Sequence, residues 1–284
     1  MSIKHIYLFL LISIGCQKLE NRIDPFAKLT EVERDSAAIQ YNEMSDYMLQ
    51  PSDKHRILKD TALMLAPNNI EFRQVLSYSY KKRGENIRAM EILNEAVSRD
   101  VAKGSVDGLQ YRAWSLLYYY RDYEGSISDI DQLLAMSKQK YSICWGEPCG
   151  LLKGQALYKL GKYQEAIATF DTVLTEEVKR GFKAEDNYLV HFYKGMCYHK
   201  MGNYDLALKN YNLVLHKDEN FTEVLYQNGL VHLAMNEKTV AKRYFEKALY
   251  WVKKGKKMGE PYFERFDEVF EWQIIEAQDK IKKE

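Results

Sequence analysis

The sequence has little of the two residues that interrupt regular structure. It contains only 5 Pro and 15 Gly in 284 residues. Long disordered tracts are usually richer in these residues, so their scarcity argues against such a tract and permits many helices. Hydrophobic residues make up 46% of the chain and charged residues 29%, which is typical of a folded domain.

An excess of charge of either sign is also absent. The chain has 41 Lys and Arg residues against 40 Asp and Glu residues, which leaves a net charge of +1. Binding of nucleic acid usually needs a basic domain or a basic face. We therefore expect no nucleic-acid partner.

The sequence lacks the motifs on which common catalytic and cofactor sites are built. It has no Gly-rich phosphate loop, no HExxH and no nucleophile elbow. His191 and His199 fall on one predicted helix, where the rise per residue places them about 12 Å apart, too far to share one metal ion. We expect no enzyme activity, no cofactor and no metal site.

A hydrophobic run long enough to cross a bilayer is missing, but a shorter one opens the chain. Lys4 supplies positive charge and residues 6–14 are mostly apolar, short of the about 20 residues that a spanning helix needs. A charged start followed by a short apolar core is the layout of a secretory signal. The run closes at Gly15 and Cys16, and a small residue before Cys resembles the lipobox of bacterial lipoproteins. Ser13 stands where that family usually has Leu.

This resemblance implies a lipid anchor. Residues 1–15 would be cleaved as a signal peptide, the thiol of Cys16 would carry a diacylglycerol, and residues 16–35 would form a tether to the membrane. The implied location is the cell envelope of a Gram-negative bacterium. Gln17, rather than Asp, favours the outer membrane over the inner one. An ordinary cleaved signal and an uncleaved apolar anchor remain as alternatives.

Only three cysteines follow Cys16. An exported protein meets an oxidising environment, in which Cys144 and Cys149 can form a disulfide if the four residues between them turn the chain. The sequence leaves that bond open. Neither a CxxC motif nor a His pair accompanies these cysteines, which argues against a zinc site. Cys197 lies in an apolar helical pattern and is expected to be a small core residue.

Internal repetition is the strongest positive signal. Residues 152–174, 193–215 and 227–249 align without gaps. Each segment has Gly in its first half, then Gly or Asn at a central turn, then Ala, and then an aromatic residue four positions after the Ala. The conserved small residues are Gly154, Ala166, Gly195, Ala207, Gly229 and Ala241, and the aromatic residues are Phe170, Tyr211 and Phe245.

The repeated residue types suit two antiparallel helices that cross closely. A short side chain at the crossing lets the backbones approach, and the aromatic ring fills the space beside it. Gly or Asn ends the first helix because either residue tolerates the left-handed conformation of a C-cap. The last two segments lie 34 residues apart, and this pattern resembles the tetratricopeptide repeat family, whose unit has that length.

The resemblance implies an all-α fold, an α-solenoid in which antiparallel helix pairs form a right-handed superhelix. About six pairs are expected over residues 36–255, with the strongest match at 147–255. Trp114 replaces a small crossing residue, so its helix pair should be spread or shifted. Residues 256–284 are expected to form a C-terminal capping helix whose apolar face includes Phe263 and Phe266.

In this family the first helices of the units line a concave surface that binds partners. The family's groove positions carry over to Tyr111, Tyr118, Tyr158, Phe192, Met196, His199 and Tyr226. Aromatic anchors of this kind suit an extended apolar peptide or an amphipathic helix. For each residue, packing between helices is the alternative interpretation.

Three functional hypotheses follow. The leading one is a membrane-anchored protein–protein interaction module that binds a peptide or an envelope protein in the aromatic concave groove. The second is a structural subunit of an envelope complex that uses the convex face. The third is a glycan-binding protein whose Tyr rings stack on sugars.

Overall fold

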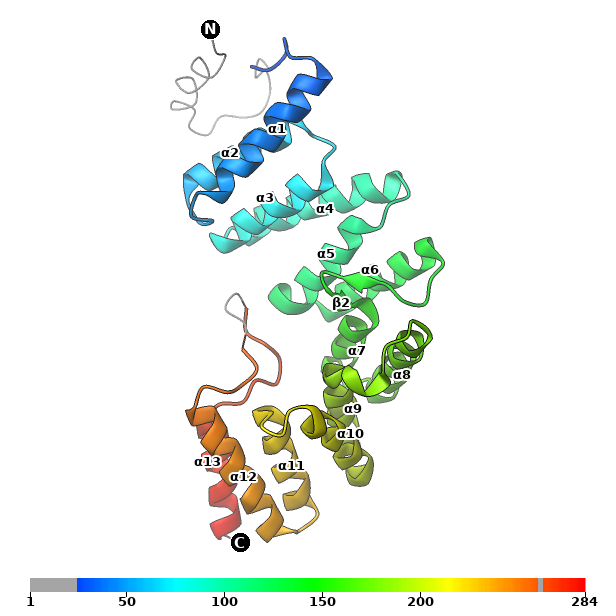
Figure 1. The fold of residues 1–284 in the computed structure, drawn as a ribbon, viewed down its shortest axis with the longest axis vertical. Coiled ribbons are helices and arrows are strands. Elements are labelled where there is room, and N and C mark those ends of the chain that lie inside the picture. Colours follow the sequence, from blue (N-terminus) through cyan, green and yellow to red (C-terminus); the bar gives the residue numbers. More distant parts are fainter. Residues whose placement is uncertain (1–24, 260–262, 284) are drawn as a thin grey trace. The chain divides into compact units, whose positions relative to one another are not determined.

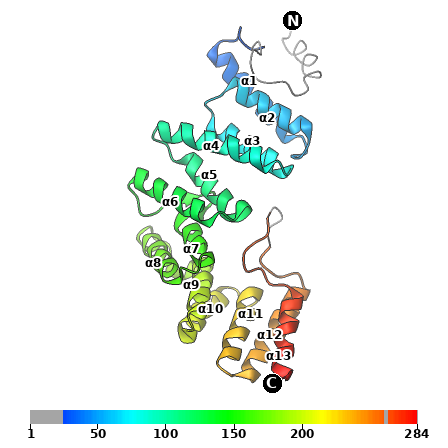
Figure 2. The same cartoon turned by 180° about the vertical axis from the view of Figure 1, so that it is seen from behind.

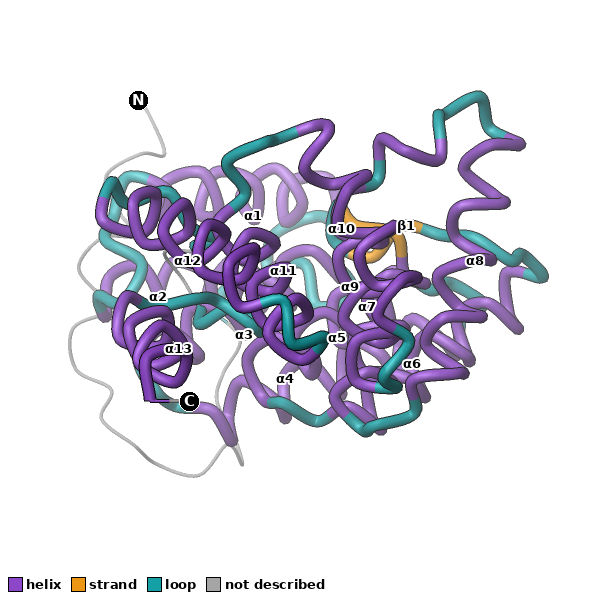
Figure 3. The backbone as a smooth tube through the Cα atoms, turned by 90° about the horizontal axis from the view of Figure 1, so that it is seen from below, coloured by secondary structure: helices purple, strands orange, loops and turns teal. Residues whose placement is uncertain are grey.

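The computed structural model describes residues 25–259 and 263–283. The predicted signal peptide and Cys16 lie outside these residues. The chain divides into two compact units between Phe72 and Arg73. Within the described ranges, no helix is both long and apolar enough to cross a membrane. Apart from one short hairpin, the described chain consists of helices and connecting loops (Figure 3).

The first unit holds one helix pair, α1 (Glu31–Asp46) and α2 (Asp53–Leu65). Thr30 caps α1: its hydroxyl accepts from the backbone N–H of Glu33, and the Glu33 carboxylate accepts from the N–H of Thr30 at 2.9 Å. Ala62 is fully buried in the core of this pair.

The second unit contains five further helix pairs among the described residues (Figure 1). They are α3 (Ile70–Lys82) with α4 (Asn86–Ala102), α5 (Asp107–Ser115) with α6 (Tyr123–Ser137), α7 (Cys149–Lys159) with α8 (Tyr163–Lys179), α9 (Tyr188–Lys200) with α10 (Tyr204–Lys217), and α11 (Thr222–Ala234) with α12 (Lys238–Lys253). Successive pairs from α5 onward pack against one another. The predicted all-α array of stacked helix pairs is confirmed.

Three of these pairs cross at a glycine that faces an aromatic ring. A methyl group added at any of the three glycines would overlap ring carbons of the partner helix, so the helices can cross this closely only without a side chain there. The contacts are Gly154 with Phe170, Gly195 with Tyr211, and Gly229 with Phe245. The three following alanines, Ala166, Ala207 and Ala241, are fully buried.

The α5–α6 pair departs from this pattern. Ala113 rather than Trp114 lies against the second helix: Ala113 is fully buried, and its carbonyl accepts a hydrogen bond from Ser126 at 2.9 Å. The helix then continues as a π-helical turn, η2 (Leu116–Tyr120), which accommodates an additional residue. The helix crossing is therefore shifted by one residue, and Trp114 turns toward other aromatic rings.

A disulfide-closed hairpin lies between α6 and α7. The two-residue strands β1 (Ile143–Cys144) and β2 (Glu147–Pro148) pair antiparallel, and Cys144 is bonded to Cys149. Trp145 and Gly146 form the turn with φ values of 53° and 89°. Two consecutive residues with positive φ are what a tight hairpin turn needs. A short 3-10 helix, η3 (Ala184–Asp186), connects α8 to α9.

The C-terminal region differs from the predicted continuous capping helix. Helix α13 begins only at Glu271 and runs as Glu271–Lys283, beside α12 and α11 in both views (Figures 1 and 2). Its Ile274 and Ala277 are buried in the core of the last helix pair. Residues 263–270 are not helical. Gly255, with φ of 76°, ends α12, and Asp267, with φ of 56°, opposes any helix through this segment.

Candidate functional site

Aromatic rings from α5, η2 and the turn of the disulfide-closed hairpin gather on one surface of the second unit. We call Tyr111, Trp114, Tyr118, Tyr119 and Trp145 the aromatic face. The ring centroids of Tyr111 and Trp145 lie 4.6 Å apart. The ring centroid of Trp114 lies 5.6 Å from that of Tyr118 and 5.6 Å from that of Tyr119. The π-helical turn η2 supplies two of these rings, so the shift in the α5–α6 pair contributes to the surface.

A lysine from α3 lies against this cluster. The Nζ atom of Lys81 is 3.5 Å from the ring centroid of Tyr119, 5.4 Å from that of Tyr111 and 5.6 Å from that of Trp114. The rings attract the charged ammonium group, but they also shield it from water. Burial is the larger effect and lowers the pKa of Lys81 to about 7.

The disulfide hairpin positions two members of the site. Trp145 lies in its turn and remains 53% exposed. Glu147 accepts a hydrogen bond from the Tyr118 hydroxyl at 2.8 Å, and that hydroxyl also lies 2.8 Å from the side-chain oxygen of Gln155. Burial, together with the adjacent Glu147 carboxylate, raises the pKa of Tyr118 well above its ordinary value.

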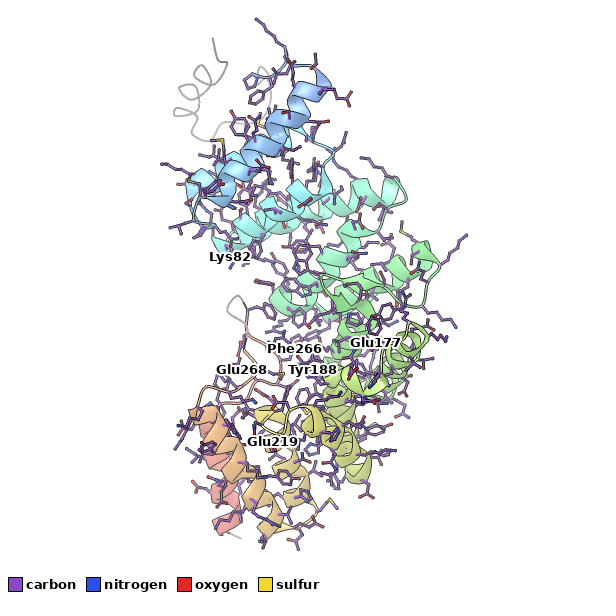
Figure 4. The ribbon with its side chains drawn as sticks, in the orientation of Figure 1. Lys82, Glu177, Tyr188, Glu219, Phe266 and Glu268 are labelled. Atoms are coloured by element: carbon purple, nitrogen blue, oxygen red, sulfur yellow. A yellow bond between two sulfur atoms is a disulfide. The ribbon has the colours of Figure 1, made fainter. Side chains whose placement is uncertain are left out.

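A segment from the far end of the chain covers part of the aromatic face. We call residues 263–267, Phe-Glu-Arg-Phe-Asp, the inserted segment. The ring of Phe263 stacks on Tyr118 with centroids 4.8 Å apart and meets Trp114 at 5.4 Å. Figure 4 labels Phe266, the second aromatic residue of the segment. The centroid of its ring lies 5.5 Å from that of Tyr118, and its side chain is only 5% exposed.

Charged groups around the aromatic face also meet the inserted segment. Lys159 forms an ion pair with Asp267 at 3.2 Å, and Arg265 faces Glu147 at 3.9 Å. The guanidinium of Arg121 lies 4.2 Å from the Phe266 ring centroid and donates to the backbone carbonyl of Glu264. The segment therefore has both apolar and electrostatic partners.

Three buried tyrosines lie near the carboxylate of the inserted segment. Burial is the main cause that raises the pKa of Tyr158, Tyr193 and Tyr211, and the negative charge of Asp267 adds to the effect for each. These phenols remain neutral over the ordinary pH range.

The connection that carries the inserted segment is held at its base. The buried carboxylate of Glu223 accepts from the backbone N–H of Met258 at 2.7 Å, and Lys257 pairs with Glu268 at 2.5 Å. Burial raises the pKa of Glu223 despite this hydrogen bond. A cavity of about 280 Å³ adjoins the base and is lined in part by Tyr188 and Phe221.

Three of the seven groove residues predicted from sequence contribute to this site, and four lie elsewhere. Tyr111 and Tyr118 belong to the aromatic face, and Tyr158 lies beneath Asp267. The structure places Phe192 and Met196 in the packing between helices, where Phe192 is fully buried against Tyr211 and Met196 accepts from the Tyr211 hydroxyl. These two side chains are not accessible to a partner.

The remaining two predicted residues are half-buried and lie away from the inserted segment. His199 makes an edge contact with Tyr204, and burial lowers its pKa. Tyr226 packs against Phe245 in the core shared with α13.

Sequence reasoning missed several residues of the site. Lys81, Trp145, Glu147, Arg121 and Lys159 all contact the aromatic face or the inserted segment. The signal that could have found Trp145 and Glu147 was the segment between Cys144 and Cys149, which contains both and whose disulfide the sequence left open. Over the residues with described positions, no group of three or more His, Cys, Asp or Glu side chains is arranged to hold a metal ion.

Two models of the tetratricopeptide repeat family match the chain, one over residues 151–220 and one over residues 222–251. These ranges run from α7 to near the end of α12, so this part of the array is built of tetratricopeptide repeats. Arrays of this family act as protein–protein interaction modules and are typically not enzymes. Comparison with curated proteins finds no significant match.

Solved structures share the fold at low sequence identity. PilF from Pseudomonas aeruginosa is 15% identical, with a TM-score of 0.60 over 86% of this chain and 99% of that one. A tetratricopeptide repeat protein from Parabacteroides merdae is 17% identical, with a TM-score of 0.52 over 91% of this chain and 86% of that one. MamA from Desulfovibrio magneticus is 15% identical, with a TM-score of 0.54 over 65% and 96%. These similarities establish the fold.

Proposed function

We propose that the protein is a membrane-anchored interaction module that binds a peptide or an envelope protein on the aromatic face. The observation that carries this proposal is that the face already holds a non-helical, aromatic and charged segment of the same chain. A surface that accommodates such a segment has the chemistry to accept a similar segment from another protein.

The exposed ring of Trp145 supports this role. It is 53% exposed at the edge of the face and packs against Tyr111 and Trp114 on its other side. Aromatic side chains held in this way are frequent binding hot spots, because they bury a large area at little cost in conformational entropy. Trp145 is therefore an accessible anchor for a partner.

The membrane anchor belongs to the proposal on sequence grounds. Cys16 follows an apolar run and a small residue, and lipidation there would place the array at the surface of the envelope membrane. The disulfide in the hairpin is consistent with an exported protein, since such bonds persist in oxidising compartments.

Affinity capture from native envelopes tests the binding surface. We expect Trp145→Ala to reduce capture of the partner at least tenfold, since loss of a hot-spot anchor costs about 2 kcal/mol or more. Tyr118 and Tyr158 are less suitable for this test because both are buried, and their removal would disturb the fold.

The matched control is Phe182→Ala, which removes an aromatic side chain that is 62% exposed in the connection after α8. This variant should capture the partner as well as the unaltered chain. Equal loss in both variants, or loss only in Phe182→Ala, would count against the aromatic face and favour a structural subunit that uses other surfaces.

A further inference from the structure

The connection between α12 and α13 extends away from both helices. It leaves the end of α12 at Lys253, reaches η2 and α7, and returns to α13 at Glu271 (Figures 1 and 2). A link between two adjacent helices can be only a few residues long. The extra length brings the inserted segment to the aromatic face.

The aromatic residues of the inserted segment make most of its apolar contacts. Phe263 meets Trp114, Tyr118 and Tyr119 with centroids 4.8 to 5.4 Å apart. Phe266, three residues later, stacks on Tyr118 and meets the edge of Tyr123 at 6.1 Å. The three-residue spacing of Phe263 and Phe266 thus lets both rings contact Tyr118.

The charges of the segment are complementary to those of the helices. Asp267 pairs with Lys159 at 3.2 Å, and the Nζ atom of Lys159 is also 5.1 Å from the Phe266 ring centroid. The Arg121 guanidinium lies 4.2 Å from the centroid of the same ring. Phe266 and Asp267, an aromatic side chain followed directly by a carboxylate, therefore each have a cationic partner.

Residues 256–258 and Glu268 of the connection are held by contacts that do not involve the inserted segment. Glu223 binds the N–H of Met258, Lys257 pairs with Glu268, and Lys256 pairs with Asp218 at 2.8 Å. These contacts lie on either side of the inserted segment in the sequence. Release of residues 263–267 would therefore break none of these contacts.

The contacts of the inserted segment leave some buried polar atoms without a hydrogen-bond partner. The Oδ2 atom of Asp267 and the Nη1 atom of Arg121 are buried without a hydrogen-bond partner. Asp267 also adopts the left-handed conformation, with φ of 56°, which non-glycine residues seldom adopt. Unsatisfied polar atoms and backbone strain weaken an interaction, so an occupant without these features can compete.

We propose that residues 263–267 occupy the aromatic face as an internal ligand, and that the partner is an extended peptide with the same chemistry. Such a peptide carries two aromatic side chains three residues apart and a carboxylate directly after the second. This inference rests on the proposed function, because it names the chemistry of the partner for that surface. Binding of the partner requires displacement of the chain's own segment.

A labelled synthetic peptide tests the inference on the full-length chain. The probe is Phe-Glu-Arg-Phe-Asp-Glu-Val-Phe, which copies residues 263–270, and fluorescence anisotropy measures its affinity. We expect the Phe263→Ala/Phe266→Ala variant to bind the probe at least tenfold more tightly than the unaltered chain. The attached segment otherwise competes at an effective concentration on the order of 1 mM.

Two controls accompany this variant. Glu264→Ala removes an exposed side chain and keeps the backbone carbonyl that accepts the hydrogen bond from Arg121. The affinity of this variant for the probe should therefore equal that of the unaltered chain. A probe with Ala at both Phe positions should bind the double variant at least tenfold more weakly. The inference is overturned if the double variant binds no better than the unaltered chain, or if both probes bind alike.

A second variant keeps the test valid if the double variant folds poorly. Arg265→Glu retains both Phe rings and places like charge opposite Glu147, 3.9 Å from the present guanidinium. It should also bind the probe more tightly than the unaltered chain, and unchanged affinity would contradict the proposal. A dimer in size-exclusion chromatography, formed by exchange of the segment between copies, would overturn it in favour of a second chain as occupant.

The two proposals can fail separately. If the probe does not bind but capture of the partner still depends on Trp145, the partner has other chemistry and only the inference fails. If the probe binds but capture does not depend on Trp145, the proposed function fails on this surface.

Discussion

Lys81 is a single residue whose charge state depends on the aromatic face. Its ammonium group lies among four rings, from Tyr78, Tyr111, Trp114 and Tyr119, with its closest centroid at 3.5 Å. The pKa of about 7 means that the folded protein binds this proton more weakly than the unfolded chain does. Lys81 therefore lowers the free energy of unfolding, and this effect has its full size below about pH 7. The effect disappears as pH rises toward the ordinary lysine pKa.

We expect Lys81→Met to have a higher free energy of unfolding than the unaltered chain at pH 6. This gain over the unaltered chain should become smaller at each higher pH. Between about pH 7 and pH 10, the difference between the two proteins should shrink by up to about 1.4 kcal/mol per pH unit. Urea unfolding at pH 6, 8 and 9.5 measures this difference.

A difference that stays constant with pH would mean that the pKa of Lys81 is not lowered in the folded protein, so that its ammonium group remains solvated. That outcome would also weaken the case that the aromatic rings exclude water from this part of the face.

At the scale of helices, three glycine–aromatic crossings set the spacing of the helix pairs. Gly195 lies on α9, and the Tyr211 ring that faces it on α10 is fully buried. Alanine favours a helix interior over glycine by about 1 kcal/mol, so the substitution has a stabilising component. Overpacking of a rigid core usually costs about 1–3 kcal/mol and occasionally more.

We expect the steric cost to be larger, because an added Cβ would overlap several carbons of the Tyr211 ring. Gly195→Ala should therefore lower the free energy of unfolding by about 1–2 kcal/mol, as measured by urea unfolding. Gly259→Ala is the control, since a Cβ there meets nothing within 4 Å. Equal or greater stability of Gly195→Ala would show that the helices do not cross at this residue as described.

The regular helix pairs could be predicted from sequence because local chemistry determines them. Gly154, Gly195 and Gly229 recur at one place in each unit, and each meets the aromatic residue expected to fill the gap. The C-terminal segment could not be predicted in the same way. Phe263 and Phe266 fit the apolar face of a helix, but their partners are rings more than a hundred residues earlier in the chain.

For the molecule as a whole, only some of the groove residues predicted from the family's positions lie at the aromatic face. Tyr111, Tyr118 and Tyr158 were placed on a binding surface because the family uses those positions. Phe192 and Met196 were placed there by the same rule, but the structure has them between helices. Carrying over the family's groove positions assumes that every helix pair has the same rotation within the array. The one-residue shift at Ala113 and the long connection before α9 break that assumption.

Long-range contacts account for the rest of the site. Trp145 and Glu147 reach the aromatic face only because the hairpin folds back on α5, and the inserted segment arrives from beyond α12. Neither contact leaves a periodic pattern in the sequence. The complementary charges of Lys159 and Asp267 become meaningful only when the fold places them 3.2 Å apart.

Photo-crosslinking in native envelopes tests the central claim most directly. A photoreactive residue at position 145 samples the aromatic face, and one at position 87 samples an exposed site at the start of α4, where Ile87 is 81% exposed. The account predicts a partner crosslink from position 145 whose yield rises when Phe263 and Phe266 are replaced by Ala, and none from position 87. Crosslinks confined to position 87, or a yield at position 145 that falls when the inserted segment is removed, would contradict it.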